Sequence, residues 1–422
     1  MKGRSAARRR GRSIAIAMPF AALLAVGAAV TAHADSIRDA EYWLTEYGIR
    51  QAWTVTQGQG ITIAVIDTGV DATVPDLKGA VLPGADFSGE GDPRGWEPVG
   101  AQDSEHGTLV ASMAAGRGKG PNEGLIGAAP GAMILPLSIT LGDELVDSDT
   151  QIAEAVRYAV DHGAQVINMS LTRNTLDWPT SWDDAFSYAA EHDVVVVAAA
   201  GNRGSGTTVV GAPATMPGVL TVAGVDHDGV ASFDASSQGI TVAIAAPSEG
   251  LVGAAPGGTY RAWSGTSGAA PIVAGIVALV RAAHPDLDAA NVINRIVATA
   301  HDRGEAGYDP YYGYGVIDAA AAVSAEVPVV AANPMGSLAD WIAVYRPAVV
   351  DPAVRPTPVV VVPQPDPLTE PTAGGPFGKV LAPLELLRTA GPGVLAVVAF
   401  AFGLAGLAVW AIRRADGARR SR

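Results

Sequence analysis

Short apolar runs alternate with amphipathic stretches through the middle of the chain. Runs of five to seven mostly apolar residues predict buried strands at Ile61–Ile66, Met133–Leu137, Gln165–Met169, Val194–Ala199, Val219–Val225 and Ile240–Ala246. Helical periodicity between and after them predicts helices at His106–Ala115, Thr150–Asp161, Ser181–His192 and Ser267–Ala283. Apolar strands separated by helices are typical of a parallel sheet covered on both faces. We therefore expect an α/β fold with a mostly parallel sheet.

Three polar residues fall at the ends of these predicted elements. Asp67 ends the first strand, His106 opens a helix, and Ser267 opens the long apolar helix. Ligand chemistry in parallel sheets gathers beyond the carboxyl ends of the strands. A serine hydroxyl needs a base to accept its proton, and a histidine base needs a carboxylate to hold its tautomer. Asp67, His106 and Ser267 are therefore candidates for a catalytic triad.

A fourth candidate, Asn202, follows another predicted strand. Its side-chain amide can donate to the oxyanion that forms when a serine attacks a carbonyl, with the Ser267 N–H at a helix N-terminus as second donor. The alternative is that Gly201 and Asn202 are ordinary turn residues.

Four motifs in a fixed order resemble the subtilisin-like serine proteases, or subtilases. They are Asp67-Thr68-Gly69, His106-Gly107-Thr108, Gly201-Asn202 and Gly265-Thr266-Ser267 with Pro271 four residues on, and the resemblance runs from about Gly60 to Ala322. It implies a three-layer α/β/α subtilisin-like fold, a triad of Asp67, His106 and Ser267, and an oxyanion hole at Asn202. An aspartic protease would need a second Asp-Thr/Ser-Gly, which the sequence lacks.

Met169-Ser170-Leu171 resembles the edge strand along which subtilases pair the substrate backbone. The resemblance therefore implies that Ser170 and Leu171 bind substrate.

Narrower features resemble the mycosins, the membrane-anchored subtilases of type VII secretion systems. Leu109 stands where secreted subtilisins commonly have a second histidine, and only 32 residues, Asp35 to Ile66, lie between a predicted signal and Asp67. That segment is too short for a folded inhibitory prodomain. The sequence departs from many mycosins because it has no cysteine and no long insertion beside His106.

Charge is segregated along the chain. The net charge is −14, with +6 in the first 34 residues, +4 in the last ten, and the acid in the body between them. An acidic body lacks the basic footprint of a nucleic-acid binder. The absence of cysteine excludes disulfides, a thiol nucleophile and a Cys-ligated metal.

Both basic ends adjoin apolar runs. Lys2–Arg12, the apolar Ile14–Val30 and Ala32-His33-Ala34 predict a cleaved secretory signal, with an uncleaved anchor helix as the alternative. Gly393–Ile412 is 20 residues without a charge, directly followed by Arg413 and Arg414. It predicts a transmembrane helix with a cytoplasmic tail and an extracytoplasmic body; a buried core helix is the alternative.

These boundaries predict seven regions. They are a signal peptide at 1–34, an N-terminal extension at 35–60, a subtilisin-like peptidase domain at 61–346, a Pro-rich linker at 347–378, a juxtamembrane segment at 379–392, a transmembrane helix at 393–412 and a basic cytoplasmic tail at 413–422.

The triad chemistry requires no metal or organic cofactor. Asp86, Glu90, Asp92 and Asp103 carry oxygen ligands that suit calcium, but their irregular spacing in an acidic chain favours a solvated loop.

We therefore expect a membrane-anchored, extracytoplasmic serine endopeptidase that acts on proteins or peptides and belongs to a type VII secretion membrane complex. The alternatives are a structural subunit that stabilises the complex, with dispensable proteolysis, and a general degradative protease. The sequence does not reveal the cleavage motif.

Overall fold

The computed structural model describes residues 36–120, 122–141 and 147–346. The predicted signal peptide, linker, juxtamembrane segment, transmembrane helix and tail lie outside these residues.

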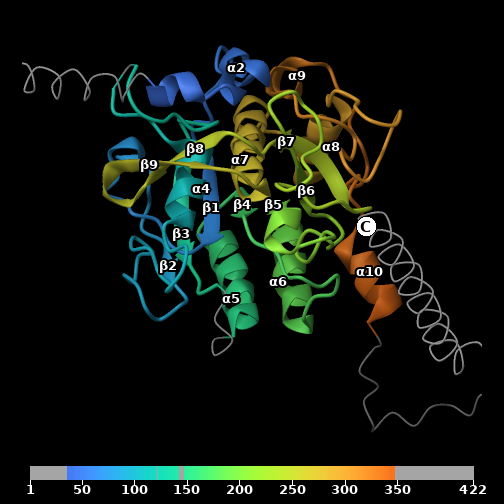
Figure 1. Ribbon diagram of the computed structural model, residues 1–422. Helices are drawn as coiled ribbons and strands as arrows, with labels where there is room; N and C mark the ends of the chain where they lie inside the picture. The colour runs from blue at the N-terminus through green and yellow to red at the C-terminus, as the bar shows by residue number, and fades with distance from the viewer. Residues whose placement is uncertain (1–35, 121, 142–146, 347–422) are drawn as a thin grey trace, which may run out of the picture. The chain divides into compact units, whose positions relative to one another are not determined.

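Seven strands form one sheet in the order β2-β3-β1-β4-β5-β6-β7 (Figure 1). They are β1 (Thr62–Asp67), β2 (Ala85–Asp86), β3 (Met133–Ser138), β4 (Val166–Met169), β5 (Val195–Ala199), β6 (Leu220–Val225) and β7 (Val242–Pro247). Neighbouring strands are parallel, so their carboxyl ends lie along one edge of the sheet. Six of these strands were predicted from the sequence, and the two-residue β2 was not.

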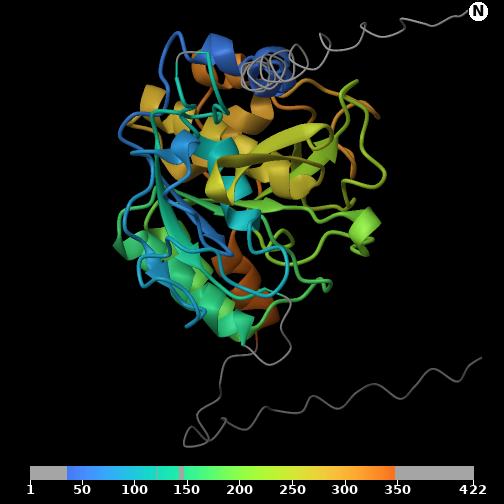
Figure 2. The same cartoon turned by 60° about the vertical axis from the view of Figure 1, so that its left-hand side comes forward.

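Helices cover both faces of the sheet (Figures 1 and 2). α5 (Ser148–Asp161) and α6 (Thr180–Glu191) pack side by side on one face, and α4 (His106–Ala115) and α7 (Thr266–Ala283) pack together on the other. All four correspond to predicted helices. The expected α/β fold with a mostly parallel sheet is confirmed.

Several shorter elements were not predicted. They are α2 (Trp43–Glu46), α3 (Ile49–Ala52), α8 (Ala289–Ala298), α9 (Ala319–Ser324), α10 (Leu338–Tyr345), the 3₁₀ turns η1 (Pro75–Leu77), η2 (Arg203–Ser205) and η3 (Pro256–Gly258), and an antiparallel hairpin of β8 (Leu251–Ala255) and β9 (Thr259–Trp263).

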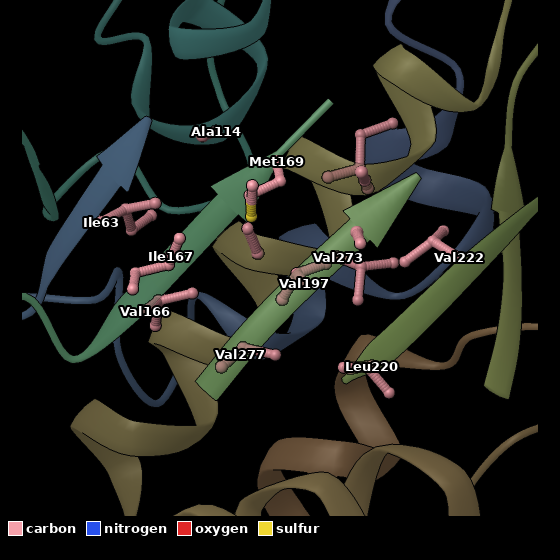
Figure 3. Close-up of a cluster of buried hydrophobic side chains, with 14 of the residues drawn as sticks. Ile63, Ala114, Val166, Ile167, Met169, Val197, Leu220, Val222, Val273 and Val277 are labelled. Carbon is pink, nitrogen blue, oxygen red and sulfur yellow. The ribbon is translucent and has the colours of Figure 1, made fainter. Parts of the chain in front are cut away.

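α7 lies at the centre of the apolar core. Its Val273 and Val277 pack against strand residues such as Ile167 and Val197 (Figure 3). Among the described helices α7 alone is long and apolar enough to cross a membrane, but 83% of it is buried in the protein, which identifies it as a core helix. Because α7 is buried in the core, Ser267, its second residue, has a fixed position at the edge of the sheet.

The N-terminal extension packs into the same core. Trp43, Leu44 and Ile49 are fully buried, and the Trp53 indole donates to the Ala128 carbonyl at 2.8 Å. No hydrogen bond among the described residues joins 36–60 to the candidate triad. The extension is therefore an integral part of this fold.

Glu41 of the extension is a buried carboxyl group. Its Oε1 accepts from the Ile126 N–H at 2.7 Å, whereas its Oε2 has no hydrogen-bond partner among the described residues and lies 3.4 Å from Arg38 Nε. Burial raises the pKa of Glu41 to about 8, despite the opposing effects of the Ile126 N–H and Arg38.

We predict that the protein loses stability between about pH 5 and pH 8. In that window the folded protein keeps a proton on Glu41 that the unfolded chain releases, so the free energy of unfolding falls by at most about 1.4 kcal/mol per pH unit. Thermal melts at several pH values should show a Tm that declines with pH, and Glu41→Gln should flatten that decline. Asp39→Asn, at an exposed position of the same extension, is the control and should leave the decline unchanged. A decline equally steep in Glu41→Gln would contradict the prediction.

Candidate active site

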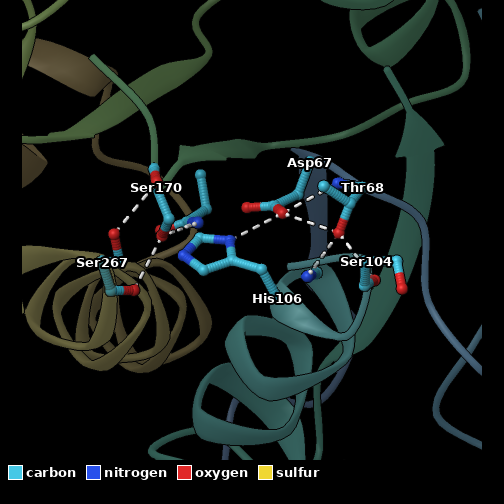
Figure 4. A network of polar contacts seen from close by, with 8 residues as sticks. Asp67, Thr68, Ser104, His106, Ser170 and Ser267 are labelled. Atoms are coloured by element: carbon cyan, nitrogen blue, oxygen red, sulfur yellow. Dashed lines mark hydrogen bonds and ion pairs between the residues drawn. The ribbon is translucent and has the colours of Figure 1, made fainter. Parts of the chain in front are cut away.

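Asp67 and His106 meet at the edge of the sheet. Asp67 is the last residue of β1 and is fully buried, and His106 is the first residue of α4. His106 Nδ1 lies 2.8 Å from Asp67 Oδ1 (Figure 4). Because an ionised carboxylate only accepts, this contact places a proton on Nδ1 and leaves Nε2 free to accept one.

Two glycines allow α4 to approach β1 closely. A β-carbon on Gly107 would lie 2.2 Å from the Gly69 carbonyl oxygen, and one on Gly69 would lie 2.2 Å from the Glu97 carbonyl oxygen. Gly69 also has a φ of +85°. The glycines of the Asp-Thr-Gly and His-Gly-Thr motifs are therefore required by close backbone contacts and, at Gly69, by a left-handed conformation.

Thr68 ties the two motifs together. Its N–H donates to Asp67 Oδ1 at 2.8 Å, and its hydroxyl donates to the Ser104 carbonyl at 2.9 Å and accepts from the Gly107 N–H at 3.0 Å. The hydroxyl therefore fixes the start of the helix that carries His106. This role was not predicted from the sequence, because it depends on the packing of α4 against β1.

Opposing effects set the basicity of His106. Burial lowers the pKa of the imidazole, but the charge and hydrogen bond of Asp67, together with the charge of Asp103, outweigh burial and raise the pKa above its ordinary value.

Ser267 lies on the other side of the imidazole from Asp67 (Figure 4). Its hydroxyl donates to the Ser170 carbonyl at 3.2 Å, and the Ser170 hydroxyl donates to the Ser267 carbonyl at 2.9 Å. Within the described residues no hydrogen bond joins Ser267 to His106. In enzymes without substrate such contacts are often long, so the missing contact does not exclude His106 as the base for Ser267.

Asn202 is held with its amide N–H₂ free. Its Oδ1 accepts from the Thr266 N–H at 2.7 Å and from the Thr266 hydroxyl at 3.0 Å. No acceptor among the described residues engages Nδ2. The Ser267 N–H lies in the first turn of α7, where backbone donors have no partner in the helix. Asn202 Nδ2 and the Ser267 N–H are thus two free donors on either side of Thr266.

Ser170 and Leu171 differ from the edge strand expected from the sequence. β4 lies inside the sheet between β1 and β5, and it ends at Met169. Ser170 and Leu171 follow the last residue of β4 and lie outside its pairing with β1 and β5, although both neighbouring strands run further. No hydrogen bond among the described residues engages the main chain of Leu171 or Thr172. The exposed pairing edge is therefore the segment after β4.

Trp263 is a site residue that was not predicted. At the end of β9, its ring lies edge-on to His106 with centroids 5.7 Å apart. Next to Ser267, a β-carbon on Gly268 would lie 2.4 Å from Leu251 Cδ1, so a larger residue there would require the Leu251 side chain of β8 to move. The positions of Trp263 and Leu251 beside the site follow from the fold of the β8–β9 hairpin and were not predictable from the sequence.

Two of the four acidic residues considered for calcium, Asp86 and Asp92, have partners within their loop. The Asp86 carboxylate accepts from the Ser88 hydroxyl and the Gly91 N–H, and Asp92 pairs with Arg94 at 2.9 Å. The described part of the chain contains no cluster of three or more His, Cys, Asp or Glu side chains suited to a metal ion.

Comparison with known proteins settles the family. The model of the subtilase family, Peptidase_S8, matches residues 58–315, more than half of the chain. The chain belongs to the subtilase family. The resemblance noted in the sequence is thereby confirmed.

Curated relatives include a fervidolysin and a mycosin. The chain is 35% identical over 320 residues to fervidolysin of Fervidobacterium pennivorans, with 68% of this chain and 44% of fervidolysin covered. It is 34% identical over 341 residues to Mycosin-1 of Mycobacterium tuberculosis (strain ATCC 25618 / H37Rv), with 68% of this chain and 74% of Mycosin-1 covered. The chain thus spans less than half of fervidolysin.

Solved structures agree with the relation to mycosins. MycP1 with the N-terminal propeptide removed has a TM-score of 0.59 and 33% identity, and the match covers 69% of this chain and 98% of that one. A chain in the periplasmic assembly from the ESX-5 inner membrane complex has a TM-score of 0.58 and 30% identity, with 69% and 86% covered.

We predict that the Thr68 hydroxyl stabilises the site measurably. Thr68→Val keeps the shape but leaves the buried Gly107 N–H and the Ser104 carbonyl without this partner, so it should lower the free energy of unfolding by about 1–3 kcal/mol. Thr68→Ser keeps the hydroxyl and is the matched control. Urea unfolding of both variants measures the difference, and equal midpoints for Thr68→Val and Thr68→Ser would contradict the assignment.

Proposed function

We propose that this chain is a membrane-anchored, extracytoplasmic serine endopeptidase with Asp67, His106 and Ser267 as its triad. The observation that carries the proposal is the buried Asp67–His106 contact of 2.8 Å beside Ser267 at the start of α7. Membership of the subtilase family supports the same chemistry.

In the proposed mechanism Ser267 Oγ attacks the carbonyl carbon of a peptide bond while His106 Nε2 accepts its proton. Asp67 holds the imidazole and stabilises the imidazolium that forms. The oxyanion accepts hydrogen bonds from Asn202 Nδ2 and the Ser267 N–H. His106 then gives the proton to the leaving amine, and water releases the acyl group by the reverse route.

The main chain beyond β4 supports a role in substrate binding. The unpaired N–H and C=O groups at Leu171 and Thr172 can pair with an extended peptide as an added strand does. Because Ser170 contacts Ser267 directly, a peptide bound along this segment would place a carbonyl at the nucleophile.

Labelling by a fluorophosphonate probe tests the nucleophile. We predict that the wild-type protein forms a covalent adduct at Ser267, because His106 activates only that hydroxyl. Ser267→Ala should remove the labelled band, and Ser170→Ala, which keeps the triad, should not. A band of undiminished intensity in Ser267→Ala would exclude the proposed mechanism.

The rate should depend on pH through His106. Only the neutral imidazole accepts the serine proton, so kcat/KM should fall as the pH drops through the raised pKa of His106. Asp103→Asn removes a charge that raises this pKa, so it should move the acid limb to lower pH by a fraction of a unit while leaving the maximal rate nearly unchanged. The rate of peptide hydrolysis, measured between pH 4 and pH 9, gives the pH at which kcat/KM falls on the acid side. A limb that does not move, or that moves to higher pH, would contradict this account of the base.

Membrane anchoring is proposed from the sequence of the two ends. At about 1.5 Å per residue, Gly393–Ile412 would form a helix of about 30 Å, the thickness of a hydrocarbon core. The arginines after it favour a cytoplasmic tail and an extracytoplasmic body. The matched chain in an ESX-5 inner membrane complex supports association with a type VII secretion complex.

The same match supports a second candidate function, a structural subunit whose proteolysis is dispensable. Secretion by a Ser267→Ala strain beside a full deletion separates the two. If catalysis is the essential role, we predict that both strains lose secretion alike. Secretion that persists in Ser267→Ala and fails in the deletion would favour the structural role instead.

A further inference from the structure

P1 is the substrate residue that precedes the cleaved bond. Two segments of the protein limit the direction in which the P1 side chain can point. β4 and β5 are neighbours, and the residues after each reach the nucleophile: Ser170 contacts Ser267, and Asn202 contacts Thr266. A P1 carbonyl carbon at Ser267 Oγ, with its oxygen toward Asn202 Nδ2, therefore lies between these segments. Its side chain has to point into the space beside Gly201.

Two methyl groups lie against Gly201. A β-carbon on Gly201 would lie 2.5 Å from Cγ2 of Thr207 and 3.2 Å from Cγ2 of Thr172. Real β-carbons do not approach other carbons as closely as 2.5 Å. The methyl groups of the two threonines thus both lie close to Gly201, which precedes Asn202.

Hydrogen bonds hold Thr207 in place. It is buried, and its hydroxyl donates to Asn174 Oδ1 at 2.6 Å. Its N–H donates to the Asn202 carbonyl at 3.1 Å, and its own carbonyl accepts from the Ser237 hydroxyl. The Thr207 methyl therefore cannot swing aside without breaking these bonds.

The segment that carries Thr172 is fixed to the opposite loop. The Arg173 N–H donates to the Ala212 carbonyl at 2.7 Å, and the Ala212 N–H donates to the Thr175 carbonyl at 3.0 Å. A β-carbon on Gly211 would lie 1.7 Å from the Arg173 carbonyl oxygen, so the two loops are in direct backbone contact. Because the loops are joined in this way, a large side chain cannot push them apart cheaply.

We infer that Thr172 and Thr207 restrict P1 to glycine, alanine or serine. The inference rests on the proposed function, because it assigns the substrate class of the same site. One methylene beyond the available space changes discrimination by roughly 10–200-fold, so valine, leucine and phenylalanine at P1 are rejected by at least that factor relative to alanine.

Thr→Ser substitutions test the inference sharply, because they remove only the methyl groups. Thr207→Ser keeps a hydroxyl for Asn174, and Thr172→Ser keeps the one that donates to the Arg173 carbonyl at 3.0 Å. Thr208→Ser, at an exposed neighbouring position, is the matched control. Each detergent-solubilised full-length variant is incubated with a peptide library from a digested proteome, and new N-termini are identified by mass spectrometry against a Ser267→Ala background.

The wild-type protein and Thr208→Ser should cleave after Gly, Ala and Ser. Each single Thr→Ser variant should raise cleavage after Val and Leu relative to Ala by about tenfold or more. Wild-type cleavage after Leu or Phe as frequent as after Ala would overturn the inference, as would an unchanged P1 distribution in both single variants. If cleavage occurs and the fluorophosphonate labels Ser267 in either of those cases, the proposed function still stands. If the wild-type protein is neither labelled nor active, the proposed function fails and the inference falls with it.

Discussion

The contact between the buried Asp67 carboxylate and His106 Nδ1 is the interaction on which the rest of the site depends. A carboxylate without solvent is costly unless it is paired, so the surrounding structure has to keep its partners in place. Gly107 lets α4 approach, and the Thr68 N–H and hydroxyl fix the backbone on both sides. The contact also orients the imidazole so that its far side faces Ser267 (Figure 4).

The parallel sheet explains why residues distant in the chain converge on this contact. The carboxyl ends of β1, β4 and β5 lie along one edge and deliver Asp67, Ser170 and Asn202 there. Ser267 lies in the first turn of the core helix α7. Because α7 is buried among the strands, the position of this first turn is fixed. The apolar runs that build the core thereby determine the geometry of a polar site, which is how fold and chemistry are connected in this protein.

The strongly periodic elements and the short motifs were predictable from the sequence, because strands, helices and the Asp-Thr-Gly and His-Gly-Thr signatures are local patterns. Features that depend on tertiary contacts were not. The position of Ser170 and Leu171 beyond an interior strand follows from the strand order, which the pattern does not reveal. Trp263 beside His106 requires the β8–β9 hairpin, and the approach of Thr207 to Gly201 requires the path of the loop after β5. The helix α8 was predictable, because Val292, Ile293, Ile296 and Val297 recur with helical spacing and are buried, whereas the six-residue α9 is too short to show a period.

The central claim, that Asp67 accepts a hydrogen bond from the protonated Nδ1 of His106, can be tested directly by proton NMR. A proton shared between an imidazole nitrogen and a buried carboxylate is strongly deshielded. We predict an exchange-protected resonance far downfield of the amide region, bonded to a ¹⁵N-labelled histidine nitrogen. It should disappear in Asp67→Asn and in His106→Ala and persist in Ser267→Ala. The absence of such a resonance in the folded wild-type protein, or its persistence in Asp67→Asn, would contradict this account of the site.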